Sequence, residues 1–350
     1  MAIYRKNVYC ELEFLEKFKD SKLHIAAFGD DEVRKLLDNL WDFLRKSHLM
    51  LNIDNSKLLE LVQKEDKSSC LSYLYKGATM CVGGCKITCT NDHKYEYAEN
   101  IHKNPADRMR IDYLINRPSG VCRNWAQKYG VVIFSPTCWS SNEEAAKHKY
   151  LFIDCGAPIE KGRNIKYEWS NLLKDDYNLT NCNSMIIIDN YLKISDVECI
   201  LNCLLPTYNQ REDEFHLTVF IAGKVDTHNF NEEYKQLTKL VKNLRPCLNT
   251  RVDLFVSRDT TTFHDRCILT NNAMIKVGAG FDCIKNGSAQ RLTNIEILHP
   301  YIQNCSNGCD DFYEANIKAA KMVVNSTNRG QWIHYPEGEP CRNRLLVVEK

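Results

Sequence analysis

The sequence predicts an α/β protein, with a helix-rich α/β domain followed by a second α/β domain that contains a mixed sheet. Short apolar runs alternate with segments whose apolar residues recur at spacings of three and four, as strands and amphipathic helices require. At 350 residues, the chain is long enough to bury two hydrophobic cores. The stretch 151–183 is largely polar and contains Gly and Pro, so we expect a crossover there between domains 1–150 and 184–350.

The first domain is expected to open with helices and to continue as an α/β unit. Apolar residues at helical spacing predict helices in the segments 10–20, 30–48 and 55–65. Farther along, apolar runs within 108–117 and 128–136 read as strands that bracket a helix. A strand, a helix and a further strand indicate an α/β unit rather than a helical bundle.

In the second domain, predicted strands and helices alternate more regularly than in the first. Buried-strand runs occupy 184–192, 214–223 and 250–258. Helices are expected in 195–205, 231–244 and 310–324. Strands separated by helices of this length are typical of a largely parallel sheet. Residues 265–281 predict a hairpin that turns at Asn271-Asn272 and adds two further strands.

Composition alone does not identify a partner. Lys and Arg total 46 against 45 for Asp and Glu, so a site for a polyanion must be a local patch. One candidate is the segment 161–166. Another is the run Lys235, Lys239, Lys242 and Arg245, which lies along one predicted helix. An ordinary solvated helix face is the alternative explanation of this second run.

The cysteines are expected to be reduced. No apolar run approaches the roughly 18 residues of a membrane span, and the first residues lack a signal peptide's apolar core, so the expected location is cytoplasmic. Most of the 17 cysteines then act as small buried side chains, and no cofactor is expected. Cys81, Cys85, Cys89 and His93 are spaced by four residues. Paired zinc ligands typically have two residues between them, so a glycine-containing hairpin competes with metal binding here.

The segment TTFHDRCILTNN, residues 261–272, places His264, Asp265 and Arg266 before an apolar strand. Side chains alternate along a strand, so His264 and Arg266 share one face and Asp265 lies on the other. An imidazole beside a guanidinium forms an anion site, in which the first can attack phosphorus and the second can neutralise phosphate oxygens. The alternative is a structural histidine followed by a weak ion pair at the strand edge.

Three other residues are expected at the same site. Asp189 ends the apolar run MIIID, at the carboxyl edge where α/β sheets gather their ligands. Gly278 and Gly280 would let backbone amides approach a phosphate oxygen. Each has a structural alternative, a loop cap for Asp189 and tight turns for the glycines.

Together, IIIDNYL, FHDRCILTNN and VGAGF resemble a phospholipase-D-like domain over residues 184–324. The resemblance is closest to the branch with His-Asp-Arg in place of His-x-Lys, which includes the C-terminal domain of microtubule-interacting-and-trafficking proteins and bacterial relatives. It implies that His264 is the nucleophile and that Arg266 holds phosphate. Asn271 occupies the place of the motif's aspartate and is a candidate ligand contact. Active members bring two such histidines together, so catalysis would need a second copy of the motif, which a homodimer could provide.

The first domain, which begins with NVYCELEF, resembles the PIN-like nuclease fold. Such domains hold a divalent metal with carboxylates at strand ends, and the resemblance makes Glu11, Glu13 and Asp112 the candidates. The aspartate that usually follows the first strand is absent. Solvent-facing acids on ordinary elements are the alternative.

These expectations lead to three functional hypotheses. The leading one is a phosphodiester-binding protein with a degenerate phospholipase-D-like site, which engages nucleic acid in a bacterial defence or mobile-element system. The second is a dimeric, metal-independent phosphodiesterase or nuclease that uses His264. The third is a scaffold that binds phospholipid headgroups at a membrane surface.

Overall fold

The computed structural model describes residues 7–28, 31–64, 70–80, 85–89, 111–146, 148, 155–164, 182–205, 214–223, 230–258, 261–263, 266–278, 281, 284–285, 288–298, 309–326 and 332–346. Contacts divide the chain into two compact units, Met1–Ile153 with Tyr301–Cys305 and Asp154–Pro300 with Ser306–Lys350. Within the described ranges, every helix falls short of the length or the apolar character that a membrane crossing requires.

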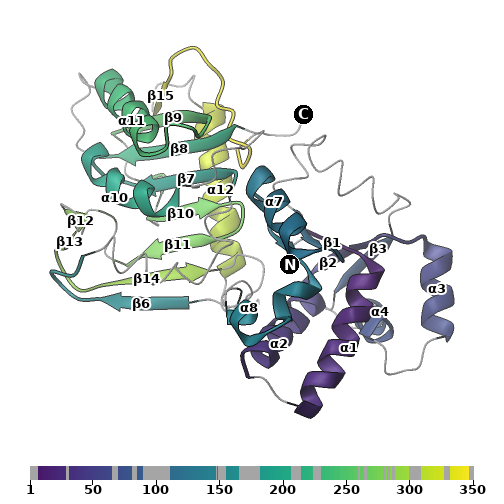
Figure 1. The fold of residues 1–350 in the computed structure, drawn as a ribbon. Helices are drawn as coiled ribbons and strands as arrows, with labels where there is room; N and C mark the ends of the chain where they lie inside the picture. Colours follow the sequence, from purple (N-terminus) through teal and green to yellow (C-terminus); the bar gives the residue numbers. More distant parts are fainter. Residues whose placement is uncertain are drawn as a thin grey trace. The chain divides into compact units, whose positions relative to one another are not determined.

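The first unit is built on a parallel sheet of five described strands in the order β3-β2-β1-β4-β5 (Figure 1). The strands are β1 (Asn7–Cys10), β2 (His48–Leu51), β3 (Lys86–Cys89), β4 (Ile111–Leu114) and β5 (Ile133–Phe134). β1 pairs with β2 on one side and with β4 on the other. The strand order therefore reverses between β1 and β4, and open α/β sheets bind ligands beside the carboxyl ends of strands at such a point.

Helices cover both faces of this sheet. They are α1 (Leu12–Phe28), α2 (Asp31–Lys46), α3 (Asn55–Lys64), α4 (Cys70–Met80), α7 (Ser119–Tyr129), α8 (Asn142–Ala146) and the 3-10 helix η2 (Pro136–Trp139). Val8 and Cys10 of β1 pack in one core with α1 and α2, whereas Tyr9 packs on the other face with α7. Alternate side chains of β1 are thus buried on opposite faces, as a central parallel strand requires. The helices predicted near the start of the chain are confirmed.

The second unit is built on a mixed sheet of eight described strands in the order β15-β9-β8-β7-β10-β11-β14-β6 (Figure 1). The strands are β6 (Cys155–Ile159), β7 (Ser184–Asp189), β8 (Phe215–Ala222), β9 (Thr250–Ser257), β10 (Cys267–Thr270), β11 (Met274–Val277), β14 (Thr293–Leu298) and β15 (Trp332–Tyr335). β7, β8 and β9 run parallel, and the other neighbours pair antiparallel. The predicted α/β class and mixed sheet are confirmed.

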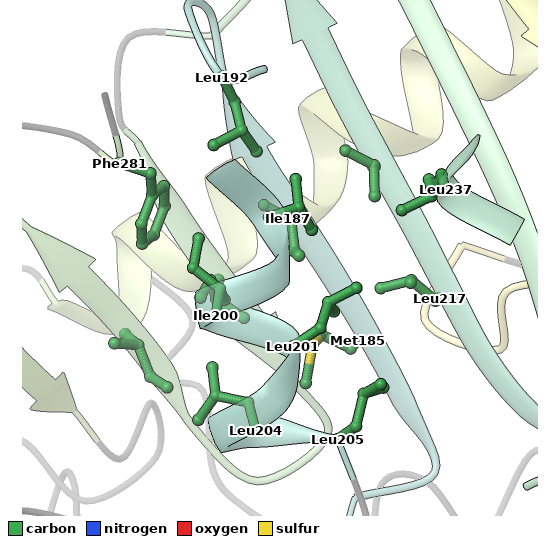
Figure 2. Close-up of a cluster of buried hydrophobic side chains, with 14 of the residues drawn as sticks. Met185, Ile187, Leu192, Ile200, Leu201, Leu204, Leu205, Leu217, Leu237 and Phe281 are labelled. Atoms are coloured by element: carbon green, nitrogen blue, oxygen red, sulfur yellow. The ribbon is translucent and has the colours of Figure 1, made fainter. Parts of the chain in front are cut away.

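The core of the second unit lies between this sheet and its helices. The helices are α10 (Ile194–Leu204), α11 (Phe230–Leu244) and α12 (Cys309–Ser326). α10 and α11 cover one face, and α12 crosses the other (Figure 1). Figure 2 shows Met185 and Ile187 of β7 against Ile200, Leu201 and Leu204 of α10, all of them buried. Each buried side chain of this size contributes about 1.5–3 kcal/mol, which favours the burial of MIIID at the centre of the sheet.

The edges of the second sheet differ from the sequence expectation. Cys155–Ile159 falls inside the predicted crossover 151–183, yet it forms β6 and pairs with β14. At the opposite edge, β15 pairs with β9. Antiparallel strands therefore flank the parallel strands on both sides, and the sheet is less parallel than the spacing of its helices predicts.

Candidate functional site

Strand pairing brings Asp189 and Arg266 together at the carboxyl end of β7. The antiparallel register of β10 against β7 places Arg266, just before β10, beside Asp189, the last residue of β7. Asp189 is fully buried, and both of its carboxylate oxygens accept hydrogen bonds from backbone amides. Oδ1 accepts from Tyr191 at 2.9 Å and Oδ2 accepts from Phe281 at 2.7 Å. The acid therefore ties the end of β7 to the segment that follows β11.

Arg266 lies between this buried carboxylate and an exposed aromatic ring. Its Nε is 4.0 Å from Oδ1 of Asp189, and its guanidinium carbon is 4.8 Å from the centroid of the Tyr191 ring. The Arg266 side chain keeps 29% of its surface exposed. A guanidinium that is fixed by two neighbours and still reaches solvent is suited to paired hydrogen bonds with phosphate oxygens.

The other predicted members of this site are only partly described. His264, Asp265 and Gly280 lie outside the described residues. Gly278, after the end of β11, lies at the same end of the sheet's strands as Arg266, because β11 runs antiparallel to β10. Its amide donates to the Asn294 carbonyl at 3.0 Å, so this N–H continues the pairing of β11 with β14 and does not face a phosphate oxygen.

Asn271 lies at the opposite end of β10 from Arg266. Five residue steps along an extended chain separate them by about 16 Å. Asn271 is buried: its Oδ1 accepts from the Asn183 amide at 3.0 Å, and its Nδ2 donates to Asn272 Oδ1 at 3.1 Å. The predicted hairpin turn is confirmed, since the Thr270 amide donates to the Ala273 carbonyl at 2.8 Å. The structure thus corrects the expectation that Asn271 shares a ligand with Arg266.

The basic face of α11 has the character of a solvated helix surface. Its exposed lysines are Lys235, Lys239 and Lys242. Lys235 forms an exposed ion pair with Glu232 at 2.7 Å. Arg245 is not part of an exposed row, because it donates to the Asn202 carbonyl at 3.1 Å and so links α11 to α10. Of the predicted basic segment 161–166, Lys166 lies outside the described residues.

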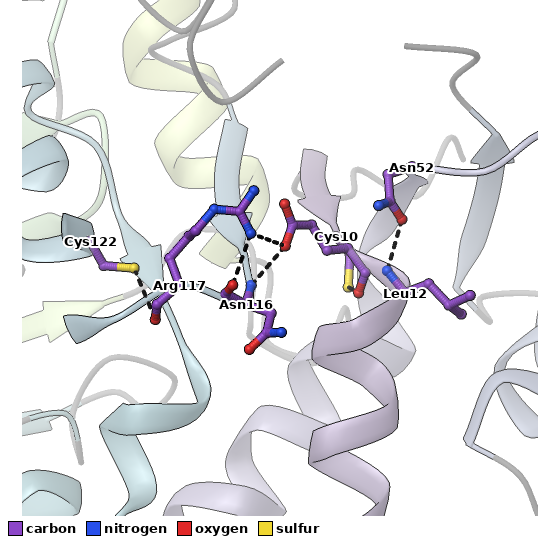
Figure 3. Close-up of polar contacts among 7 residues, drawn as sticks. Cys10, Leu12, Asn52, Asn116, Arg117 and Cys122 are labelled. Atoms are coloured by element: carbon purple, nitrogen blue, oxygen red, sulfur yellow. Dashed lines mark hydrogen bonds and ion pairs between the residues drawn. The ribbon is translucent and has the colours of Figure 1, made fainter. Parts of the chain in front are cut away.

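The first unit places a second acid and arginine at the carboxyl edge of its sheet (Figure 3). Glu11 directly follows β1 and is fully buried. Its Oε2 accepts hydrogen bonds from the backbone N–H of Asn116 at 2.8 Å and from Nη1 of Arg117 at 3.2 Å. Arg117 also donates to the Asn116 carbonyl at 2.9 Å. These bonds connect the ends of β1 and β4, where the strand order reverses.

This arrangement disfavours the metal-ligand role that the PIN-like resemblance would give Glu11, and because Glu11 is buried it is not a solvent-facing acid either. A carboxylate that accepts hydrogen bonds from an amide and a guanidinium lies beside a positive charge, which opposes a divalent cation at the same oxygen. Glu13 lies in the first turn of α1, and Asp112 lies within β4 rather than at its carboxyl end. Among the residues that the structure describes, no three His, Cys, Asp or Glu side chains gather as a metal site would require.

The regularly spaced cysteines are also only partly described, because Cys81 and His93 lie outside the described residues. Cys85 is buried, and its Sγ donates to the Leu74 carbonyl at 3.0 Å. Burial raises the pKa of the half-buried Cys89. The Cys85 thiol is therefore engaged within the core of the first unit.

Sequence reasoning missed three residues that lie, like Arg266, at the carboxyl ends of the parallel strands of the second sheet. Tyr191 follows β7, Arg258 follows β9 and Arg291 precedes β14, and all three are exposed. The available signal was their position beside strand ends, because the ends of parallel strands meet at one edge of a sheet. The contact between Tyr191 and Arg266 carried no local signal.

The chain matches no protein-family profile and no curated protein sequence. The geometry of the Arg266 edge is therefore the basis for a functional proposal.

Proposed function

We propose that the second unit binds a phosphodiester group at Arg266, and that the ligand is nucleic acid. The observation that supports this most is the placement of the guanidinium, with buried Asp189 at 4.0 Å, the Tyr191 ring at 4.8 Å and part of the side chain exposed. At 4.0 Å the carboxylate is an ion-pair partner that helps to orient the guanidinium. Such an arginine can meet a phosphate through two parallel N–H groups.

The proposal concerns binding rather than cleavage. Arg266 takes the place of the lysine in the phospholipase-D-like pattern that the sequence resembles. An arginine remains protonated at any ordinary pH, so it neutralises phosphate charge but does not deliver a proton. Arg266 itself therefore supplies positive charge to a bound phosphodiester and no proton.

Nucleic acid is preferred to a lipid headgroup because basic residues recur along the edge. Arg258 and Arg291 are exposed at the same edge as Arg266, beside β9 and β14. Neighbouring strands lie about 4.8 Å apart, so this row spans about 24 Å. A backbone with repeated phosphates matches such a row, whereas a single headgroup meets only one of its members.

The test is the affinity of a labelled oligonucleotide, measured by fluorescence anisotropy across a salt series. Arg266→Gln should weaken binding and reduce the slope of log K against log salt by about one unit. Lys239→Gln, on the exposed face of α11, is the matched loss of one charge and should have little effect. Arg266→Lys keeps a positive charge beside Asp189 and controls for the fold.

Two results would argue against the proposal. Salt-dependent binding that Arg266→Gln leaves unchanged would place the ligand elsewhere. Binding to vesicles that contain anionic phospholipid, without binding to the oligonucleotide, would assign the phosphate contact to a lipid headgroup.

A further inference from the structure

The Tyr191 ring is an exposed aromatic surface on a fixed backbone. The residue is 52% exposed. Its amide donates to Oδ1 of Asp189 at 2.9 Å, and Nδ2 of the adjacent Asn190 donates to the Phe263 carbonyl at 3.2 Å. The turn after β7 therefore presents the ring at a defined position on the carboxyl edge of the sheet.

Arg266 lies over one face of this ring, with its guanidinium carbon 4.8 Å from the centroid. With a cation over one face, a ring that is half exposed still offers aromatic surface to a ligand. Nucleobases stack on such surfaces, and because every base has a π-face, this contact tolerates different bases. The ring and the proposed phosphate contact are thus immediate neighbours.

We propose that this edge binds single-stranded nucleic acid, with one unpaired base stacked on Tyr191 and an adjoining phosphate on Arg266. This inference rests on the proposed function, because it takes Arg266 as the phosphate contact. It also selects a class of nucleic acid. The bases of a duplex are stacked on one another, whereas unpaired bases can turn outward onto a protein side chain.

The charges around the Tyr191 ring are compatible with a nucleic-acid chain that passes over it. Lys193 is exposed two residues after Tyr191, and Arg258 and Arg291 lie farther along the same edge on either side. Asp189, the acid that contacts Arg266, is fully buried. A nucleic-acid chain that lies along these β-strand ends would therefore contact cations on both sides of the stacked base.

The experiment compares three ligands of equal length: a single-stranded oligonucleotide, its abasic analogue and a duplex. Tyr191→Leu removes the ring, and Tyr191→Phe is the matched variant that keeps it. Tyr191→Leu should lower affinity for the base-containing single strand about tenfold. It should leave affinity for the abasic strand unchanged, and Tyr191→Phe should bind like wild type. The wild type should bind the single strand more tightly than the duplex.

Tyr191→Trp provides a second readout at the same position. The fluorescence that the introduced tryptophan adds, taken as the difference between the variant and wild type, should be quenched by the base-containing strand and not by the abasic strand. The inference is overturned if Tyr191→Leu binds the base-containing strand as wild type does, or if the duplex binds more tightly. If Arg266→Gln still lowers affinity for the abasic strand in that case, the phosphate contact at Arg266 is supported and the base stacking on Tyr191 is not. If Arg266→Gln affects neither strand, the proposed function fails as well.

Discussion

Both units carry a buried acid and an arginine at the carboxyl edge of their sheet, but the two pairs differ in closeness and exposure. In the first unit, Oε2 of Glu11 lies 3.2 Å from Nη1 of Arg117, and the Arg117 side chain is 16% exposed. In the second unit, Oδ1 of Asp189 lies 4.0 Å from Nε of Arg266, and the Arg266 side chain is 29% exposed. The first is a direct hydrogen bond, and the second is a looser contact nearer the surface.

The difference shows what each acid does. Glu11 directs one oxygen to both an amide and the guanidinium, so the loss of its charge would leave Arg117 in a largely buried position without that partner. Asp189 directs its two oxygens to two backbone amides and touches Arg266 only at longer range. We therefore expect the first pair to contribute to stability, and the second arginine is the one that we propose as the ligand contact.

The largest effect is expected from Glu11→Gln. The variant keeps the shape of the side chain but leaves the Arg117 cation beside a neutral amide. The free energy of unfolding should fall by about 3 kcal/mol, measured by urea denaturation. The double variant Glu11→Gln/Arg117→Gln should recover part of this loss, because neither charge is then present. A Glu11→Gln protein as stable as wild type would show that the first pair contributes little to stability.

The next effect depends on pH and arises in the second unit, at the amino end of β8. Burial first, and then the nearby charges of Arg344 and Arg251, lower the pKa of His216 to about 4 from the ordinary value of 6.5. A hydrogen bond with the backbone of Arg342 acts in the opposite direction, and the partly exposed Glu214 carboxylate lies 3.3 Å from Nε2. The folded state thus favours the neutral imidazole.

A histidine whose pKa is lowered by folding stabilises the protein above its unfolded pKa, and this stability is lost as the pH falls. The free energy of unfolding should therefore decrease between pH about 6.5 and 4, by at most about 3.4 kcal/mol. Urea denaturation at several pH values measures the decrease, and His216→Gln should make it shallower. The interpretation fails if wild type and His216→Gln lose stability in parallel.

A smaller effect is expected from Asp189→Asn. The amide keeps the size of the carboxylate but turns one acceptor into a donor that faces a backbone N–H. The free energy of unfolding should fall by about 1–3 kcal/mol. Oligonucleotide affinity should also fall, because Arg266 loses its orienting charge. A loss of stability larger than that of Glu11→Gln would reverse the comparison and assign Arg266 a structural role.

The smallest effect is expected from Lys235→Ala on α11. The Lys235 and Glu232 side chains are 60% and 61% exposed, so water screens their ion pair. The free energy of unfolding should change by less than about 0.5 kcal/mol, and oligonucleotide affinity should change little. A marked loss of affinity would instead favour the α11 lysines as the nucleic-acid contact.

The central strands were predictable from sequence because they are buried on both faces. β7 and β8 are continuous apolar or buried runs, and helices of regular spacing follow them. β6 was missed because its sequence, CGAPI, contains Gly and Pro and forms an edge strand. β14 alternates buried and exposed residues over TNIEIL, a strand signal that the expectation did not use.

The candidate site was predictable only where strand register decides it. The sequence analysis expected Asp189 and Arg266 at one site, and the antiparallel pairing of β10, the first strand of the hairpin, with β7 places the two residues side by side. The same hairpin carries Asn271 to the other end of the strand, which motif spacing alone did not reveal. Arg117 meets Glu11 across a sequence separation of 106 residues, through pairing between β1 and β4 that no local pattern specifies.

A co-crystal structure with a short single-stranded oligonucleotide tests the central claim most directly. The account predicts a phosphate oxygen within hydrogen-bond distance of the Arg266 guanidinium, at the carboxyl edge of β7. A phosphate bound only at the α11 lysines, or an oligonucleotide that leaves the Arg266 edge unoccupied, would contradict it.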